Sequence, residues 1–89
     1  MRIKEGYLLR QVADTWVIVP LALDTVDFNG MITLNDSAVL LWRELEKGAD
    51  TASLVRAMTA EYSVSQQQAR EDIEEFLRTI DQVGCLIKD

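Results

Sequence analysis

The sequence predicts an α+β fold, with a three-stranded antiparallel β-sheet followed by three α-helices in a winged helix-turn-helix-like order. Apolar residues alternate with a period of two as far as Leu34, and they recur at helical spacing from Asn35 onward. Strands that all precede the helices favour two layers, with the helices on one face of the sheet. Because the chain has 89 residues and no internal linker, we expect a single domain over residues 1–89.

Two runs rich in β-branched and aromatic residues, 7–12 (YLLRQV) and 15–19 (TWVIV), predict a β-hairpin. Ala13 and Asp14 form the short turn between them. Pro20 has no backbone N–H, so we expect it to end the second strand or to occupy a position that needs no partner.

A third strand is expected over residues 28–34 (FNGMITL), where Gly30 allows a turn or a bulge near its start. Alternation places Met31 and Thr33 on one face of this strand and their neighbours on the other. The pattern does not decide which pair points inward.

Three capped helices follow the strands. Each is preceded by a side chain that accepts hydrogen bonds from free N–H groups, and the first and third end at a glycine. The expected caps are Asn35 and Gly48 for the first helix, Asp50 or Thr51 for the second, and Ser65 and Gly84 for the third. On the apolar face of the first helix, Trp42 is expected to be a core residue.

The charge of the chain disfavours nucleic acid as a partner. The formal net charge is −6, whereas nucleic-acid binding depends on Lys and Arg that neutralise phosphates. The first ten residues lack the apolar segment of a signal peptide, and no apolar run approaches the roughly 20 residues of a membrane helix. We therefore expect a soluble, cytoplasmic protein with no membrane partner.

The residues of common catalytic and cofactor sites are missing. The chain has no histidine, and its one cysteine, Cys85, is best interpreted as a buried apolar residue. It contains no Cys-x-x-Cys, Walker-type or Gly-x-Gly-x-x-Gly motif. The acidic run at 70–75 (REDIEE) is typical of a solvated helix face, not of a metal site. These observations argue against an enzyme and predict no cofactor and no metal.

The order of residues from Ile32 to Leu86 resembles a known family. Leu-Asn precedes a helix with a Trp, Gly-x-x-Thr opens a Leu-rich helix that ends in Glu-Tyr, and an Asp-Ile-x-x-Phe-Leu helix leads to a Gly and an apolar tail. This pattern is similar to the coenzyme PQQ synthesis protein D (PqqD-like) family. The residues that carry the resemblance are Leu34, Asn35, Trp42, Gly48, Thr51, Leu54, Tyr62, Asp72, Ile73, Phe76, Leu77 and Gly84.

The resemblance implies a recognition element for ribosomally synthesised and post-translationally modified peptides. Such an element binds the leader segment of a precursor peptide and, like a chaperone, presents it to a modifying enzyme, often a radical S-adenosylmethionine (radical SAM) protein. The resemblance also implies that the leader adds as a strand beside the third strand, with its side chains in a groove against the third helix. Whether the product is PQQ or another peptide stays open.

The residues themselves indicate an edge that is open to pairing. Proteins usually protect an edge strand with lysine, proline or a bulge, and residues 31–34 (MITL) carry no charge and no proline. Either a loop or the C-terminal tail covers this edge, or it accepts an added strand. Backbone pairing alone falls short of micromolar affinity, so binding requires an apolar groove with the third helix as its other wall.

On the third helix, Ile73 and Leu77 lie one turn apart and belong either to the core or to the border of this groove. Arg70 and Glu74 flank them and are expected to set the direction of a charged peptide. The predicted peptide-binding residues are Gly30, Met31, Ile32, Thr33, Leu34, Arg70, Ile73, Glu74 and Leu77.

Two other hypotheses fit the same order of elements. A DNA-binding winged helix needs a basic recognition helix, whereas residues 65–83 contain two arginines against five acidic residues. A homodimer that pairs its exposed edges or swaps its hairpin is the other hypothesis, since small domains with exposed strands swap readily.

Overall fold

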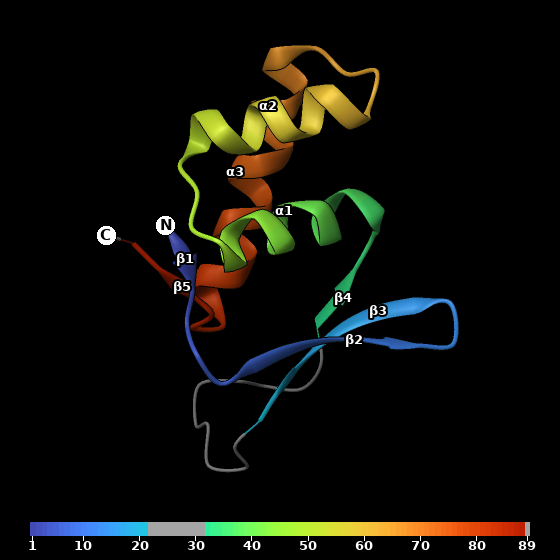
Figure 1. Ribbon diagram of the computed structural model, residues 1–89, viewed down its shortest axis with the longest axis vertical. Coiled ribbons are helices and arrows are strands. Elements are labelled where there is room, and N and C mark those ends of the chain that lie inside the picture. Colours follow the sequence, from blue (N-terminus) through green and yellow to red (C-terminus); the bar gives the residue numbers. More distant parts are fainter. Residues whose placement is uncertain (22–31, 89) are drawn as a thin grey trace.

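The computed structural model describes residues 1–21 and 32–88, and it confirms the predicted α+β fold. Strands β2 (Tyr7–Val12), β3 (Thr15–Pro20) and β4 (Ile32–Leu34) form an antiparallel sheet in the order β2-β3-β4. Helices α1 (Asp36–Glu46), α2 (Thr51–Glu61) and α3 (Gln66–Gln82) follow. Figure 1 shows the helices together above the sheet, with the β2–β3 hairpin projecting to one side.

The predicted hairpin is confirmed, with Val12 opposite Thr15 and Ala13-Asp14 as the turn between them. Ala13 has a φ of 56°, in the left-handed region that an L-residue seldom occupies outside a tight turn. Pro20 is the last residue of β3, as expected for a residue that cannot donate to the sheet.

A second, smaller sheet was not predicted. β1 (Arg2–Ile3) pairs antiparallel with β5 (Leu86–Ile87), so the expected C-terminal tail is a strand. The Lys4 N–H also donates to the Cys85 carbonyl oxygen at 2.7 Å, which extends this contact. Strands of two residues are too short to show a period in the sequence. In Figure 1 the two ends of the chain accordingly lie close together.

The predicted helix caps are present. The side chains of Asn35, Asp50 and Ser65 accept hydrogen bonds from the backbone N–H groups three residues later, at 2.9, 2.8 and 3.0 Å. Hydrogen bonds from Ser53 hold the pKa of Asp50 below its ordinary value. Gly48 and Gly84 follow α1 and α3 with φ values of 87° and 82°, the left-handed conformation that glycine adopts without strain.

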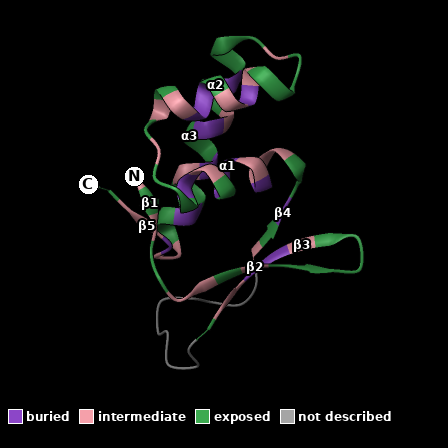
Figure 2. Cartoon of the chain, viewed as in Figure 1, coloured by how far each residue is buried: buried purple, intermediate pink, exposed green. Residues whose placement is uncertain are grey.

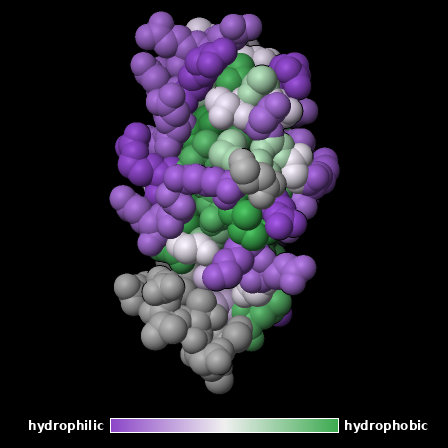
Figure 3. All heavy atoms as spheres, turned by 90° about the vertical axis from the view of Figure 1, so that its left-hand side faces the viewer, coloured by the Kyte–Doolittle hydropathy of each residue, from purple (hydrophilic) through white to green (hydrophobic). Residues whose placement is uncertain are grey.

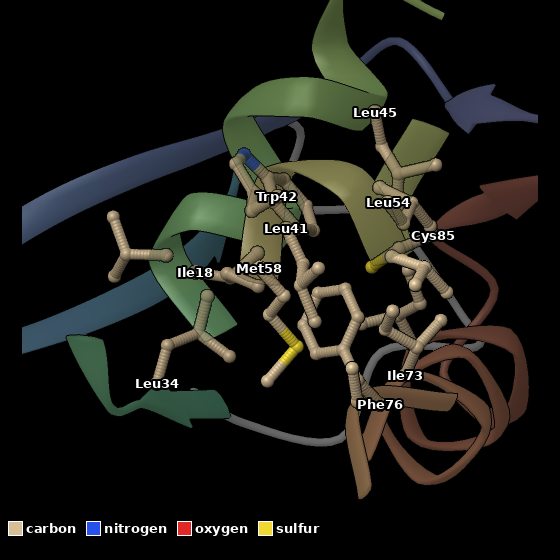
Figure 4. Close-up of a cluster of buried hydrophobic side chains, with 14 residues drawn as sticks. Ile18, Leu34, Leu41, Trp42, Leu45, Leu54, Met58, Ile73, Phe76 and Cys85 are labelled. Atoms are coloured by element: carbon tan, nitrogen blue, oxygen red, sulfur yellow. The ribbon is translucent and has the colours of Figure 1, made fainter. Parts of the chain in front are cut away.

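One hydrophobic cluster joins β3, β4, the three helices and Cys85 (Figures 2 and 4). Trp42, Leu45 and Leu54 have no exposed surface, which confirms Trp42 as a core residue. Leu34 is 6% exposed, and Ile32 packs against the same cluster, so this pair of β4 points inward. The sheet therefore has its apolar face under the helices. No helix within residues 1–21 and 32–88 has both the length and the apolar character to cross a membrane.

The burial of Cys85 predicts a nearly inert thiol. Desolvation raises the pKa of this thiol to about 11, against a smaller opposing effect of Lys4, so about one thiol in a thousand is ionised near pH 8. Because the thiolate is the nucleophile, we expect iodoacetamide to label the native protein at least about a hundredfold more slowly than the denatured protein. Mass spectrometry measures both rates, and equal rates would contradict the burial of Cys85.

The Ser65 cap predicts a measurable contribution to stability. Ser65→Ala removes the acceptor for the Gln68 N–H and should lower the free energy of unfolding by about 1 kcal/mol. Urea denaturation followed by circular dichroism measures the change. Ser63→Ala, at an exposed position ahead of the cap, is the matched control and should leave stability within about 0.5 kcal/mol.

Candidate functional site

The hairpin turn decides which backbone groups of β3 are directed toward each neighbour. In a hairpin with a two-residue loop, the residues that flank the turn form a hydrogen-bonded pair, here Val12 and Thr15. Leu21, six residues after Thr15, donates its N–H to the Gly6 carbonyl oxygen at 2.7 Å. This hydrogen bond agrees with the same alternation, because it also comes from an odd-numbered residue. The odd-numbered residues of β3 therefore direct their N–H and C=O groups toward β2, and the even-numbered residues direct theirs toward β4.

The same alternation leaves the backbone of Thr33 directed away from the sheet. Trp16 lies opposite Leu34 and Ile18 lies opposite Ile32, so these two pairs carry the hydrogen bonds between β3 and β4. Thr33 lies between them and directs both its N–H and its C=O to the other side of β4. Outside the helices and sheets, no backbone hydrogen bond of the described residues involves Thr33. Among the described residues, the outward N–H and C=O of Thr33 therefore have no backbone partner.

The C-terminal tail does not cover this edge. The sequence allowed either a loop or the C-terminal tail to cover this edge. In the structure, Leu86 and Ile87 of the tail pair instead with Arg2 and Ile3 in the small sheet. Within residues 1–21 and 32–88, β4 pairs with β3 alone. Gly30 and Met31, the first two residues of the predicted binding strand, lie outside the described residues.

A groove of about 370 Å³ runs beside the outer edge of β4. One wall is β4 with the start of α1, and the other wall is α3. We call it the β4–α3 groove, and its described lining residues are Ile32, Thr33, Leu34, Asn35, Ser37, Ala38, Leu41, Asp72, Glu75, Phe76 and Thr79.

The β4–α3 groove has an apolar floor and a polar rim. Phe76 is 8% exposed and Leu41 is 2% exposed, so both are largely covered core residues that still contribute surface to the groove. Thr33 and Glu75 are exposed at its border, and Asp72 is half-buried. An extended peptide on β4 would place alternate side chains over this floor and leave the others toward solvent.

The residues predicted on α3 lie elsewhere. Ile73 has no exposed surface and belongs to the core, which was one of its two interpretations. Leu77 and Glu74 line a different hollow, with Met1 and Leu86 among its other walls. Arg70 is exposed and is not among the described residues that line the β4–α3 groove.

The face of α3 that borders the groove differs from the face predicted to bind peptide, because the sequence does not fix the rotation of the helix about its axis. The groove-lining positions Asp72, Glu75, Phe76 and Thr79 recur at helical spacing, so they form one stripe. The predicted positions form a second stripe on the same helix. In the sequence, the acidic residues next to Phe76 could have indicated the stripe that borders the groove, but the same residues are also typical of a solvated helix face.

The Leu77 hollow, named after its central residue, lies on another side of α3. It measures about 280 Å³, and its described walls are Met1, Glu74, Leu77, Arg78, Asp81, Leu86 and Lys88. Figure 3 shows the face with the two chain ends, where hydrophobic side chains form a band flanked by hydrophilic ones. In contrast to the β4–α3 groove, this hollow has charged residues of both signs and no free strand from the larger sheet.

The comparisons with known proteins agree with the resemblance drawn from the residues. The family model described as "Coenzyme PQQ synthesis protein D (PqqD)" matches residues 16–86. A search of curated proteins found no match.

Two solved structures share the fold. "TbiB1 in Complex with the TbiA(beta) Leader Peptide" is 26% identical, with a TM-score of 0.72 over 91% of this chain and 88% of that chain. "Lasso peptide synthetase B1 complexed with the leader peptide" is 22% identical, with a TM-score of 0.76 over 98% of this chain and 96% of that chain.

The direction of the β4 backbone groups predicts a local pattern of hydrogen exchange. In the free protein, the Thr33 amide should exchange at least about tenfold faster than the amides of Ile32 and Leu34, which donate to β3. Exchange measured residue by residue by nuclear magnetic resonance tests this expectation. Equal protection of all three amides would show that another segment covers the edge.

Proposed function

The chain belongs to the coenzyme PQQ synthesis protein D family, and from this membership and the free edge of β4 we propose that it binds the leader segment of a ribosomally made precursor peptide. The leader pairs with β4 as an additional strand and places side chains in the β4–α3 groove. The observation that carries the proposal is the outward N–H and C=O of Thr33 beside an apolar hollow. TbiB1, described in complex with a leader peptide, supports it as a relative of the same fold.

The energetics require both parts of this site. Each backbone hydrogen bond contributes about 0.5–1.5 kcal/mol net, whereas association costs at least about 4 kcal/mol. A short strand therefore cannot hold a peptide at micromolar concentration by its backbone alone, since that affinity corresponds to about 8 kcal/mol. Burying about 200 Å² of apolar surface adds about 5 kcal/mol. The groove floor formed by Ala38, Leu41 and Phe76 offers apolar surface for this purpose.

We assign the protein the role of a non-catalytic adaptor. It holds the leader in an extended conformation and presents the remainder of the precursor to a modifying enzyme, which the family leads us to expect to be a radical SAM protein. Because precursor peptides are made on ribosomes, this role places the adaptor in the cytoplasm. A homodimer that pairs two β4 edges would occupy the same backbone groups and would compete with the leader.

The direct test is a titration of isotope-labelled protein with the leader peptide encoded beside its gene. We expect amide shifts at Ile32–Leu34 and along the Asp72–Thr79 face of α3. The Thr33 amide should also become protected from exchange, because it would then donate to the peptide. Unchanged amide shifts in both regions would exclude the proposed site.

Thr33→Pro separates pairing at the edge from the stability of the fold. Proline removes the outward N–H, while the hydrogen bonds to β3 come from Ile32 and Leu34. We expect leader affinity to fall at least about tenfold, because a donor is lost and the ring blocks the approaching strand. Isothermal titration calorimetry measures this loss, and circular dichroism checks that the helices are retained.

Thr33→Ala is the matched control, since it truncates the same exposed side chain but keeps the N–H. It should bind the leader within about threefold of the wild type, because a surface truncation changes little. If Thr33→Pro bound as well as Thr33→Ala, strand addition at β4 would be wrong.

A further inference from the structure

The charged side chains that the described residues contribute to the β4–α3 groove are both acidic, Asp72 and Glu75. We propose that the peptide held in this groove carries a Lys or Arg that pairs with these two carboxylates, next to an apolar residue seated over Phe76. This specificity rests on the proposed function and adds to it a class of peptide.

No Lys or Arg among the described residues lines the groove beside these carboxylates. Among the described residues, the Lys and Arg side chains lie outside the groove lining, and Lys47 and Lys88 form ion pairs with Glu44 and Asp81 elsewhere. The sequence of residues 22–31 (ALDTVDFNGM) contains two Asp and no Lys or Arg, and residue 89 is also Asp. A bound ligand would supply the positive charge that the described lining of this rim lacks.

The two carboxylates are placed to act together on one ligand group. Asp72 and Glu75 are three residues apart on α3 and thus share a face, and Phe76 of the groove floor lies on the same stripe. The Gln68 side-chain amide donates to Asp72 Oδ1 at 2.9 Å, which orients the carboxylate and leaves Oδ2 for a ligand. Because Asp72 is half-buried beside apolar surface, an ion pair there is screened less than one on an open helix face.

The start of α1 does not reverse the preference of the groove for a positively charged ligand group. A helix N-terminus favours anions through a partial charge of about half a unit. Here Asn35 Oδ1 already accepts the Ala38 N–H and the Ser37 hydroxyl, and Asp36 adds a negative charge to the first turn. Two full negative charges on α3 therefore outweigh a capped partial positive charge, and the groove selects for a cation.

The first experiment is a selection from displayed random 12-residue peptides, followed by sequencing of those that bind. We expect Lys or Arg to be enriched at one position near a fixed apolar residue. One selected peptide is then synthesised, together with versions that carry Gln or Glu in place of the basic residue. The Gln version should bind about three- to tenfold more weakly, and the Glu version more weakly still.

Variants of α3 then show which carboxylates cause the preference for the basic peptide. Asp72→Asn with Glu75→Gln should bind the basic and Gln peptides with equal affinity, and Asp72→Lys with Glu75→Lys should prefer the Glu peptide. The matched control is Glu71→Gln with Asp81→Asn, which removes the same charge from exposed positions of the same helix outside the described groove lining. This control should keep the full preference for the basic peptide, and urea denaturation verifies that all variants fold.

The outcomes separate this inference from the function on which it rests. If selected peptides shift the Thr33 amide but show no basic preference, or lose it equally in the control, the charge assignment is wrong and the binding function stands. If no selected or leader peptide shifts the Thr33 amide, the proposed function and this inference are both wrong.

Discussion

The direct connection between β4 and α1 is the constraint on which the rest of this molecule depends. Leu34, the last residue of the strand, is 6% exposed in the core, and the next residue, Asn35, caps the helix through its side chain. With no linker between a buried strand end and a capped helix start, β4 cannot move away from the helices. Its outer edge lies beside α3, and a groove lined by both elements separates them.

Hydrogen-bond alternation then decides what this edge offers. A two-residue turn sets the pairing of β2 with β3, and that pairing leaves the even-numbered residues of β3 for β4. Thr33 consequently directs its backbone outward, while Ile32 and Leu34 hold the strand to the sheet. The same alternation that anchors β4 through Ile32 and Leu34 directs the backbone of Thr33 away from the sheet, so the proposed peptide contact and the sheet pairing use different atoms of one short strand.

The surface of α3 is likewise divided into faces with different surroundings. Ile73 and Ile80 point into the core with no exposed surface, one neighbouring stripe borders the β4–α3 groove, and Leu77 lies in a separate hollow near the chain ends. The stripes of α3 on the two sides of its core stripe therefore present different charges to their surroundings. The groove receives two carboxylates, whereas the Leu77 hollow receives a mixture of both signs.

The sequence by itself determined the class of fold, the hairpin, the caps of all three helices and the membership of the family, because periodicity, turn residues and capping side chains are local signals. It did not determine the β1–β5 pair, which joins two residues from each end of the chain. Nor did it determine which stripe of α3 faces β4, because residues on neighbouring stripes have similar composition and only packing fixes the rotation of a helix. In the structure, Asp72, Glu75, Phe76 and Thr79 form the α3 wall of the groove, whereas the predicted binding residues Arg70, Ile73, Glu74 and Leu77 lie on a neighbouring stripe.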